Sequence, residues 1–207
     1  MDLSPASSGS EPLSKSDAEE LCRKLLHKEG TWVDWGRMCA RLQAAGYSTS
    51  QIFEATGFQA SQQNLVTVAA QVYGSVESSE PNSETLSWLR GPKTDVAHEL
   101  RILNHKQRAS AAEFAARKNL DVDGARELAK AMRDFRRTGV PPSAFTDAPG
   151  DTLAYQSWRR ARQTNDLVTR SRFIAQGLKT AETIRARESL EELLSDFSIT
   201  ASQKQPL

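Results

Sequence analysis

The sequence is poor in the features that mark several large classes of protein. It contains two cysteines in 207 residues and no apolar run long enough to cross a membrane. No secretory signal is visible, so Cys22 and Cys39 are expected to be free thiols among apolar helical positions. The alternation of polar and apolar residues that predicts β-strands is also missing. We therefore expect an all-α fold without membrane segments.

Motifs of common catalytic sites are absent as well. There is no phosphate-binding G-x-x-x-x-G-K, no dinucleotide-binding G-x-G-x-x-G and no nucleophile elbow G-x-S-x-G. His98-Glu99 begins like the zinc motif H-E-x-x-H, but Ile102 stands where the second histidine is needed. Asp95, His98 and Glu99 remain an alternative metal cluster, against an ordinary exposed helix face. We expect no enzyme, no cofactor and no metal.

A helix-turn-helix unit is predicted between Ser48 and Val76. Ser48 and Gln51 have the spacing of a capping box, and Gly57 suits the end of the first helix. Ser61 can cap the second helix. The apolar positions of that helix recur every three or four residues: Leu65, Val68, Ala69, Val72 and Val76.

This unit lacks the charge that nucleic-acid binding needs. Its Gln59, Ser61, Gln62, Gln63 and Asn64 lie where a recognition helix would meet base edges. However, the chain has neither Lys nor Arg between positions 41 and 90, and phosphate contacts supply most of the affinity for DNA. We therefore favour a helical module that packs against the rest of the chain or a protein partner. A helix-turn-helix regulator that binds nucleic acid is the alternative.

The chain divides into two predicted helical parts. Residues 1–15 are rich in Ser, Pro and Gly and are expected to be disordered. Residues 16–76 form the helix-turn-helix module, in which a capping box at Ser16 opens the first helix and Thr31 caps the second. Trp32 and Trp35 share a helix side with Cys39 and are expected in the core. Residues 77–84 are a linker, so the module is either packed with, or linked to, a larger helical bundle.

The larger helical domain is predicted over residues 85–199. Thr94 begins one helix and Asp121 caps another, which Gly139 and two prolines follow. The PPSAFTDAPGD segment (residues 141–151) is expected to be a loop, with helices resuming at Leu153. Residues 200–207 are polar and are expected to begin a further linker.

Charge is unevenly distributed along the chain. The net charge is −5 over residues 1–84 and +6 over residues 85–207. The densest basic run surrounds Trp158, and helical spacing places Trp158 and Ala161 on one face with the arginines around the others. Solvated or ion-paired faces, a single-stranded nucleic-acid site and a docking surface for an acidic protein all suit such a run. Our candidate partner-binding residues are Arg159, Arg160, Arg162, Arg170 and Arg172.

Several blocks of sequence resemble the Rubisco accumulation factor family, in the same order. In the N-terminal part they are KEGTWVDWG (28–36), GYSTSQIFEATGF (46–58) and QQNLVTVAAQVY (62–73). In the C-terminal part they are ELRILNHKQRASAAEFAARKNLD (99–121), GDTLAYQSWRRAR (150–162) and RFIAQGLKTAE (172–182). The resemblance covers nearly all of the chain after Ser16 and looks cyanobacterial.

The resemblance implies an assembly chaperone whose partner is the Rubisco large subunit. Members of this family brace large-subunit dimers during assembly of the octameric core, until small subunits displace them. They also carry a C-terminal β-domain that makes the full-length protein a homodimer, and this chain ends where the linker to that domain should start. We therefore expect a monomeric helical domain, located in the cytoplasm of a cyanobacterium or in the stroma of a chloroplast. Neither nucleic acid nor membrane is expected as a partner.

Overall fold

Capping residues, apolar helix faces and glycines at helix ends determine where the helices begin, pack and end. The computed structural model describes residues 12–137 and 139–202, with side chains described as far as Asp196. All regular secondary structure in these residues is helical, so the predicted all-α fold is confirmed. The elements are α1 (Lys15–Leu26), α2 (Trp32–Ala44), α3 (Thr49–Thr56), α4 (Ala60–Glu77), α5 (Ser83–Arg90), α6 (Thr94–Glu99), the 3₁₀ turn η1 (Leu100–Ile102), α7 (His105–Lys118), α8 (Val122–Asp134), α9 (Pro149–Gln163), α10 (Leu167–Thr180) and α11 (Ile184–Ser202).

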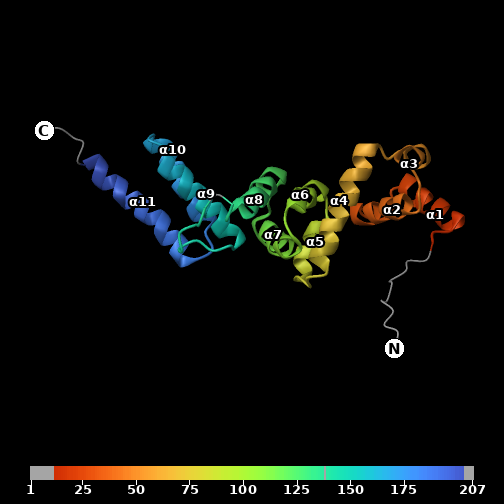
Figure 1. Ribbon diagram of the computed structural model, residues 1–207, viewed down its shortest axis with the longest axis horizontal. Coiled ribbons are helices and arrows are strands. Elements are labelled where there is room, and N and C mark those ends of the chain that lie inside the picture. Colours follow the sequence, from red (N-terminus) through yellow and green to blue (C-terminus); the bar gives the residue numbers. More distant parts are fainter. Residues whose placement is uncertain (1–11, 138, 203–207) are drawn as a thin grey trace, which may run out of the picture.

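The helices form an elongated molecule in three successive groups (Figure 1). Helices α1 to α3 lie at one end, and α4 leads from them to a middle group made of α5 to α8. Helices α9, α10 and α11 make the other end, where the antiparallel pair α9 and α10 packs beside α11. The order in space therefore follows the order in sequence.

Several predicted helix ends are confirmed. The Thr31 N–H donates to Asp34 Oδ2 at 2.8 Å, which closes a capping box at the start of α2. Ser48 and Gln51 form the expected reciprocal box at the start of α3, and Asp121 caps α8. Gly57 ends α3 with a φ of 77°, the left-handed conformation that glycine adopts at little cost.

Two predicted caps are wrong by two residues. Helix α1 begins at Lys15, and its cap is Ser14, whose hydroxyl accepts a hydrogen bond from the Asp17 N–H at 3.1 Å. Ser16 has a similar pattern around it, but the chain is already helical there. Helix α4 is capped by Gln59, two residues before Ser61, because the Gln59 N–H donates to Gln62 Oε1 at 3.0 Å.

The expected loops are shorter than the sequence indicated. Helix α9 begins at Pro149, inside the predicted loop over residues 141–151. Helix α4 runs to Glu77 and α5 begins at Ser83, so residues 78–82 alone lie outside helices in the predicted linker. Helix α11 continues to Ser202, past the expected end of the helical domain at 199. Most of the segment expected to be disordered, residues 1–11, lies outside the described residues.

Three hydrophobic clusters fill the molecule. The N-terminal core comprises Ala18, Leu21, Leu25, Cys39, Leu42, Ile52, Phe58 and Val66. The central core is the largest and includes Trp32, Val33, Ala69, Val72, Tyr73, Val76, Leu89, Ala97, Leu100, Leu103, Phe114, Leu128 and Met132. The C-terminal core comprises Phe135, Phe145, Ala154, Tyr155, Ala161, Ile174, Ala186, Leu190 and Leu193.

Helix α4 contributes to two of these cores. Val66 faces the N-terminal core, whereas Val72, Tyr73 and Val76 face the central core. Helix α4 also packs against α2. The two helices approach so closely at Gly36 that a Cβ there would overlap the carbonyl of Val66. The helix-turn-helix unit therefore packs directly into the rest of the fold, across the predicted linker.

A buried carboxylate ties the three C-terminal helices together. Asp151 is fully buried in α9 and accepts hydrogen bonds from the N–H groups of Glu182 (2.8 Å) and Thr183 (3.1 Å), between α10 and α11. It also accepts the Thr183 hydroxyl at 2.8 Å, and both the hydroxyl (2.8 Å) and the N–H (3.2 Å) of Thr146. Burial opposes its ionisation, but these hydrogen bonds prevail and hold its pKa below the ordinary value for aspartate.

Both cysteines are free thiols, as predicted. Cys39 is buried in the N-terminal core and Cys22 is partly buried beside it. Burial raises the pKa of Cys39 to about 11, with a smaller contribution from Cys22. Within the described part of the chain, no helix has the length and apolar content required to cross a membrane.

Candidate functional site

The five candidate arginines come together at the tip of the α9–α10 hairpin. Helix α9 ends at Gln163, and Asp166 then caps α10 by accepting a hydrogen bond from the Thr169 N–H at 2.8 Å. This short turn makes the two helices antiparallel, so the last turns of α9 lie beside the first turns of α10. We call residues 158–173 the hairpin tip.

Two of the five arginines help to hold the hairpin tip together. The Arg170 Nε donates to the carbonyl of Ala161 at 2.9 Å, which joins α10 to α9. The Arg159 guanidinium lies over the Tyr155 ring, 5.7 Å from its centroid. Both side chains are half-buried. Their contacts give them a structural role, whatever else they bind.

The other three arginines, Arg160, Arg162 and Arg172, are exposed. The Arg162 guanidinium lies 4.5 Å from the Trp158 ring centroid, and that of Arg160 lies 5.9 Å from the Phe173 ring centroid. No ion pair between described residues includes any of the three. Elsewhere in the described chain, five arginines pair with carboxylates at 3.0 Å or less: Arg23, Arg37, Arg117, Arg126 and Arg133. Others, such as Arg41 and Arg185, are exposed and take part in no ion pair between described residues either.

This arrangement suits the binding of anions. A guanidinium stacked on an aromatic ring is held in one orientation while its N–H groups stay exposed, and its planar fork matches a carboxylate. The helix itself partly explains why arginines occur here, since Arg160 and Arg162 lie in the last turn of α9, where the helix dipole favours cations. Arg172 has a smaller local role. Hydrogen bonds from Thr169 are the main cause of a lowered pKa at Asp166, and the charge of Arg172 adds to it.

An exposed apolar pair at the same tip escaped the sequence analysis. Leu167 and Val168 begin α10 and are 55% and 60% exposed. Among the described residues, they are the only consecutive pair of large exposed hydrophobic side chains. Their position directly after the capping residue Asp166 could have drawn attention, because the first turn of a helix needs no apolar residue to form.

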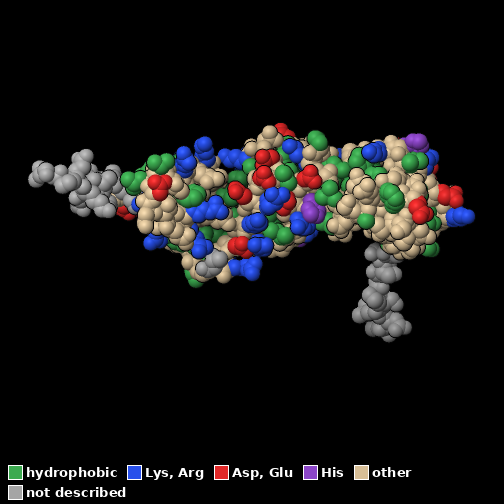
Figure 2. Space-filling view, turned by 90° about the horizontal axis from the view of Figure 1, so that it is seen from above, with side chains coloured by type: hydrophobic (Ala, Val, Ile, Leu, Met, Phe, Trp, Pro, Cys, Tyr) green, Lys and Arg blue, Asp and Glu red, His purple; other side chains and the backbone are tan. Residues whose placement is uncertain are grey.

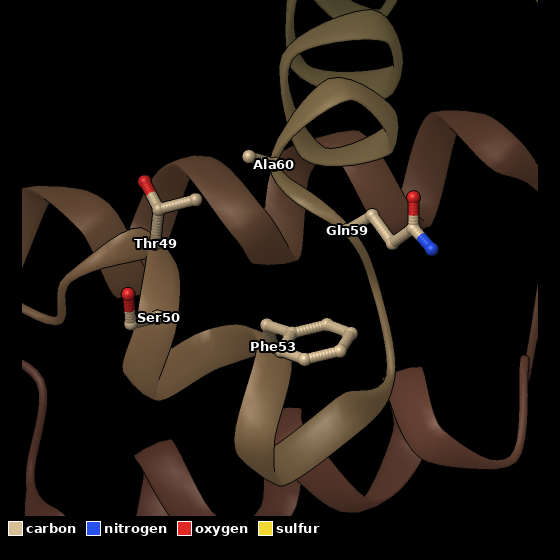
Figure 3. A pocket seen from close by; sticks show the side chains of 5 residues that line it. All are labelled: Thr49, Ser50, Phe53, Gln59 and Ala60. Atoms are coloured by element: carbon tan, nitrogen blue, oxygen red, sulfur yellow. The ribbon is translucent and has the colours of Figure 1, made fainter.

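A groove on the helix-turn-helix unit is lined by uncharged side chains. This groove of about 260 Å³ between the starts of α3 and α4 is lined by Thr49, Ser50, Phe53, Gln59 and Ala60 (Figure 3). Gln63, a candidate for contacting bases, is instead 1% exposed and donates to the carbonyls of Thr49 (3.0 Å) and Phe58 (2.7 Å). It bonds the turn between α3 and α4 and cannot reach a partner, so that part of the nucleic-acid alternative is wrong.

The alternative metal cluster has other partners. Glu99 pairs with Arg126 at 3.0 Å and with Arg101 at 3.8 Å. His98 Nδ1 lies 3.2 Å from an Arg101 nitrogen, and burial, followed by the charge of Arg101, lowers the pKa of His98. Within the described ranges, no three His, Cys, Asp or Glu side chains gather in a way that could hold a metal ion.

Comparison with known proteins supplies the family. Residues 17–77 match the model of the Rubisco accumulation factor 1 helix turn helix domain, and residues 89–194 match that of the Rubisco accumulation factor 1 alpha helical domain. A Picosynechococcus protein named RuBisCO accumulation factor 1 is 51% identical over 94% of this chain and 54% of its own length. A Synechocystis protein of the same name is 54% identical over the same shares.

Plant proteins are similar at a greater distance. The chloroplastic Rubisco accumulation factor 1 of Oryza sativa is 36% identical over 81% of this chain and 37% of its own length. The chain thus spans just over half the length of the cyanobacterial relatives it matches. The two family models match one after the other and together cover most of the chain. This chain therefore belongs to the Rubisco accumulation factor 1 family.

Proposed function

We propose that this chain is the helical part of a Rubisco assembly chaperone that binds large-subunit dimers while the octameric core is built. The observation that carries the proposal is the pair of family matches over residues 17–77 and 89–194, in that order. The names of the similar cyanobacterial proteins agree with it. No catalytic step is part of the proposal, since those relatives are named as accumulation factors.

The geometry suits a protein that holds a partner and later releases it. An assembly factor needs an interface that excludes competing contacts without becoming permanent, and polar interfaces with exposed charges meet that need. The elongated shape in Figure 1 offers a long surface for such contact. In Figure 2, Lys and Arg side chains are frequent over the end formed by α9 to α11, whereas the opposite end shows few charges.

We place partner binding on the hairpin tip. Arg160, Arg162 and Arg172 are exposed and take part in no ion pair between described residues, so they can meet carboxylates without breaking an existing bond. Arg159 and Arg170 complete the basic set from within the hairpin. Exposed charges of this kind mainly increase the association rate, and they contribute more when docking buries them.

Charge reversal at the hairpin tip tests the proposal. Arg162→Glu and Arg172→Glu, made singly, should each weaken capture of the Rubisco large subunit by about tenfold. Helix content should not change and the melting temperature should fall only slightly, because both side chains are exposed and lose no more than the contact of Arg162 with Trp158 and favourable local charge interactions. Capture is measured by pull-down and by biolayer interferometry with immobilised chain.

Gln62→Glu is the control on the helix-turn-helix unit. Glutamate keeps the side-chain oxygen that accepts the Gln59 N–H, so the cap of α4 should survive while the surface gains a negative charge. We expect normal capture by this variant. Normal capture by both arginine variants, together with loss of capture by Gln62→Glu, would move the interface to the helix-turn-helix unit.

A further inference from the structure

We infer that the hairpin tip recognises an acidic segment that also presents an apolar side chain, and that Leu167 and Val168 receive that side chain. The inference rests on the proposed function and gives the chemistry of the partner at the same surface. It begins from two neighbouring apolar side chains that the fold leaves exposed. Single exposed hydrophobic residues are ordinary, but a consecutive pair at 55% and 60% exposure gains nothing from the core.

The packing of α10 does not depend on this pair. Ile174 and Gly177 are the residues that α10 buries, and Phe173 packs against the C-terminal core. The cap at Asp166 already defines where α10 begins. Leu167 and Val168 therefore project beyond the part of the helix that the core holds, and their exposure has a cost in water that docking would remove.

Two arginines of α10 are neighbours of the apolar pair. Val168 and Arg172 are four residues apart on α10, which makes them neighbours on the helix surface, and Leu167 has the same relation to Arg170 at a spacing of three. Arg160 reaches across from α9 to the Phe173 ring, so it adds a further charge to the hairpin tip. An apolar centre with a charged rim is the usual composition of a protein–protein interface.

These features favour an acidic protein segment over nucleic acid. Single-stranded nucleic acid binds through bases stacked on aromatic rings. At the hairpin tip, guanidinium groups lie over Trp158 and Phe173, and the exposed hydrophobic side chains are aliphatic. Helix α11, which packs against α10, adds an acidic face lined by Glu188, Glu191, Glu192 and Asp196. A long polyanion would meet repulsion there, whereas a short acidic segment would not.

Paired substitutions separate the two parts of this surface. The double variant Leu167→Ser, Val168→Ser should bind the large subunit about tenfold more weakly, through faster dissociation, with its salt dependence unchanged. The double variant Arg162→Glu, Arg172→Glu should instead associate more slowly and lose most of its salt dependence. Rates are measured by biolayer interferometry over a range of salt concentrations, after circular dichroism has shown intact folding.

Matched controls exist at the other end of the molecule. Leu26 is 55% exposed at the end of α1, so Leu26→Ser removes an equally exposed leucine. Arg41 is exposed in the last turn of α2, as Arg162 is in α9, and Arg41→Glu makes the same charge change. Both controls should bind as the unchanged chain does.

A second probe keeps the inference separate from the proposed function. It is a fluorescent peptide with glutamates around a pair of leucines, compared with a leucine-free peptide of the same charge. Tighter binding of the leucine peptide, lost in the Leu167→Ser, Val168→Ser variant, supports the inference even if the large subunit fails to bind, in which case the proposed function alone falls. The inference is overturned if the serine variant binds the leucine peptide and the large subunit normally. It is also overturned if single-stranded DNA binds the hairpin tip more tightly than either peptide.

Discussion

Replacing Asp151 by asparagine should destabilise the C-terminal helices through lost hydrogen bonds and not through lost volume. The two side chains have nearly the same shape, but asparagine offers one acceptor oxygen where aspartate offers two. The N–H groups of Glu182 and Thr183 share Oδ1, so an asparagine that serves them must turn its NH₂ toward the Thr146 N–H. That partly buried hydrogen bond is then lost. The hydroxyls of Thr146 and Thr183 can rotate to adapt.

The magnitude follows from these contacts. Hydrogen bonds to a charged group contribute about 1.5–3 kcal/mol each, against about 0.5–1.5 kcal/mol for neutral pairs. Weakening several bonds at once and leaving one donor without a partner gives about 2–4 kcal/mol for Asp151→Asn. Asp151→Ala leaves all the donors without an acceptor and should cost about 3–5 kcal/mol. Urea unfolding followed by circular dichroism measures both.

The pH dependence provides a second measurement. The folded pKa of Asp151 lies below its unfolded value, so its contribution is fully present above the unfolded pKa and is lost as the pH falls through the folded pKa. The stabilities of the unchanged chain and of Asp151→Asn should therefore differ most near neutral pH and approach each other in acid. Asp147→Asn is the control, since its carboxylate is exposed and lies 3.8 Å from Arg136. Equal stability of Asp151→Asn and the unchanged chain at neutral pH, or parallel pH curves, would refute this reasoning.

Two further substitutions test the N-terminal packing. Trp32→Ala should lower the free energy of unfolding by about 3–5 kcal/mol, because the ring is buried and its Nε1 donates to the Gly91 carbonyl at 2.8 Å. Trp35→Ala, at a half-buried position, should lower it less. Equal melting temperatures for both variants and the unchanged chain would contradict the assignment of these residues to the core. Gly36→Ala should lower the urea midpoint because its Cβ would meet Ala70 Cβ at 2.5 Å, while Gly74→Ala, where nothing lies within 4 Å, should not.

Local sequence signals predicted the helix ends well where the capping partner is close by. Thr31, Ser48, Gly57 and Asp121 all act as expected, because each cap depends on residues within one turn. The same reasoning failed where two caps competed. Glutamine is a less usual cap than serine, yet Gln59 has a partner in Gln62 and starts α4 earlier than Ser61 would.

Long-range contacts account for most of the other differences. The start of α9 was missed although Pro149 at its first position is a local signal for a helix start, and the burial of Asp151 by Glu182 and Thr183, some thirty residues later, is not visible in the local sequence. Gln63 has the character of a surface residue in the sequence, but two backbone carbonyls bury it. For the candidate site, the basic run was visible from the start. Which arginines are held within the fold, as Arg170 is, depends on how α9 and α10 meet.

The double use of α4 limits how this chain can be cut or recombined. Composition suggests a boundary near residues 77–84, which invites expression of the later helices alone or exchange of the earlier ones between relatives. A fragment beginning there would lose Val72, Tyr73 and Val76, and would leave Leu89, Ala97 and Leu100 open to water. Grafting a foreign helix-turn-helix unit would need the same side chains on α4 and the same close approach at Gly36. A workable junction therefore lies before α1, or it must carry α2 and α4 together with the helices that follow.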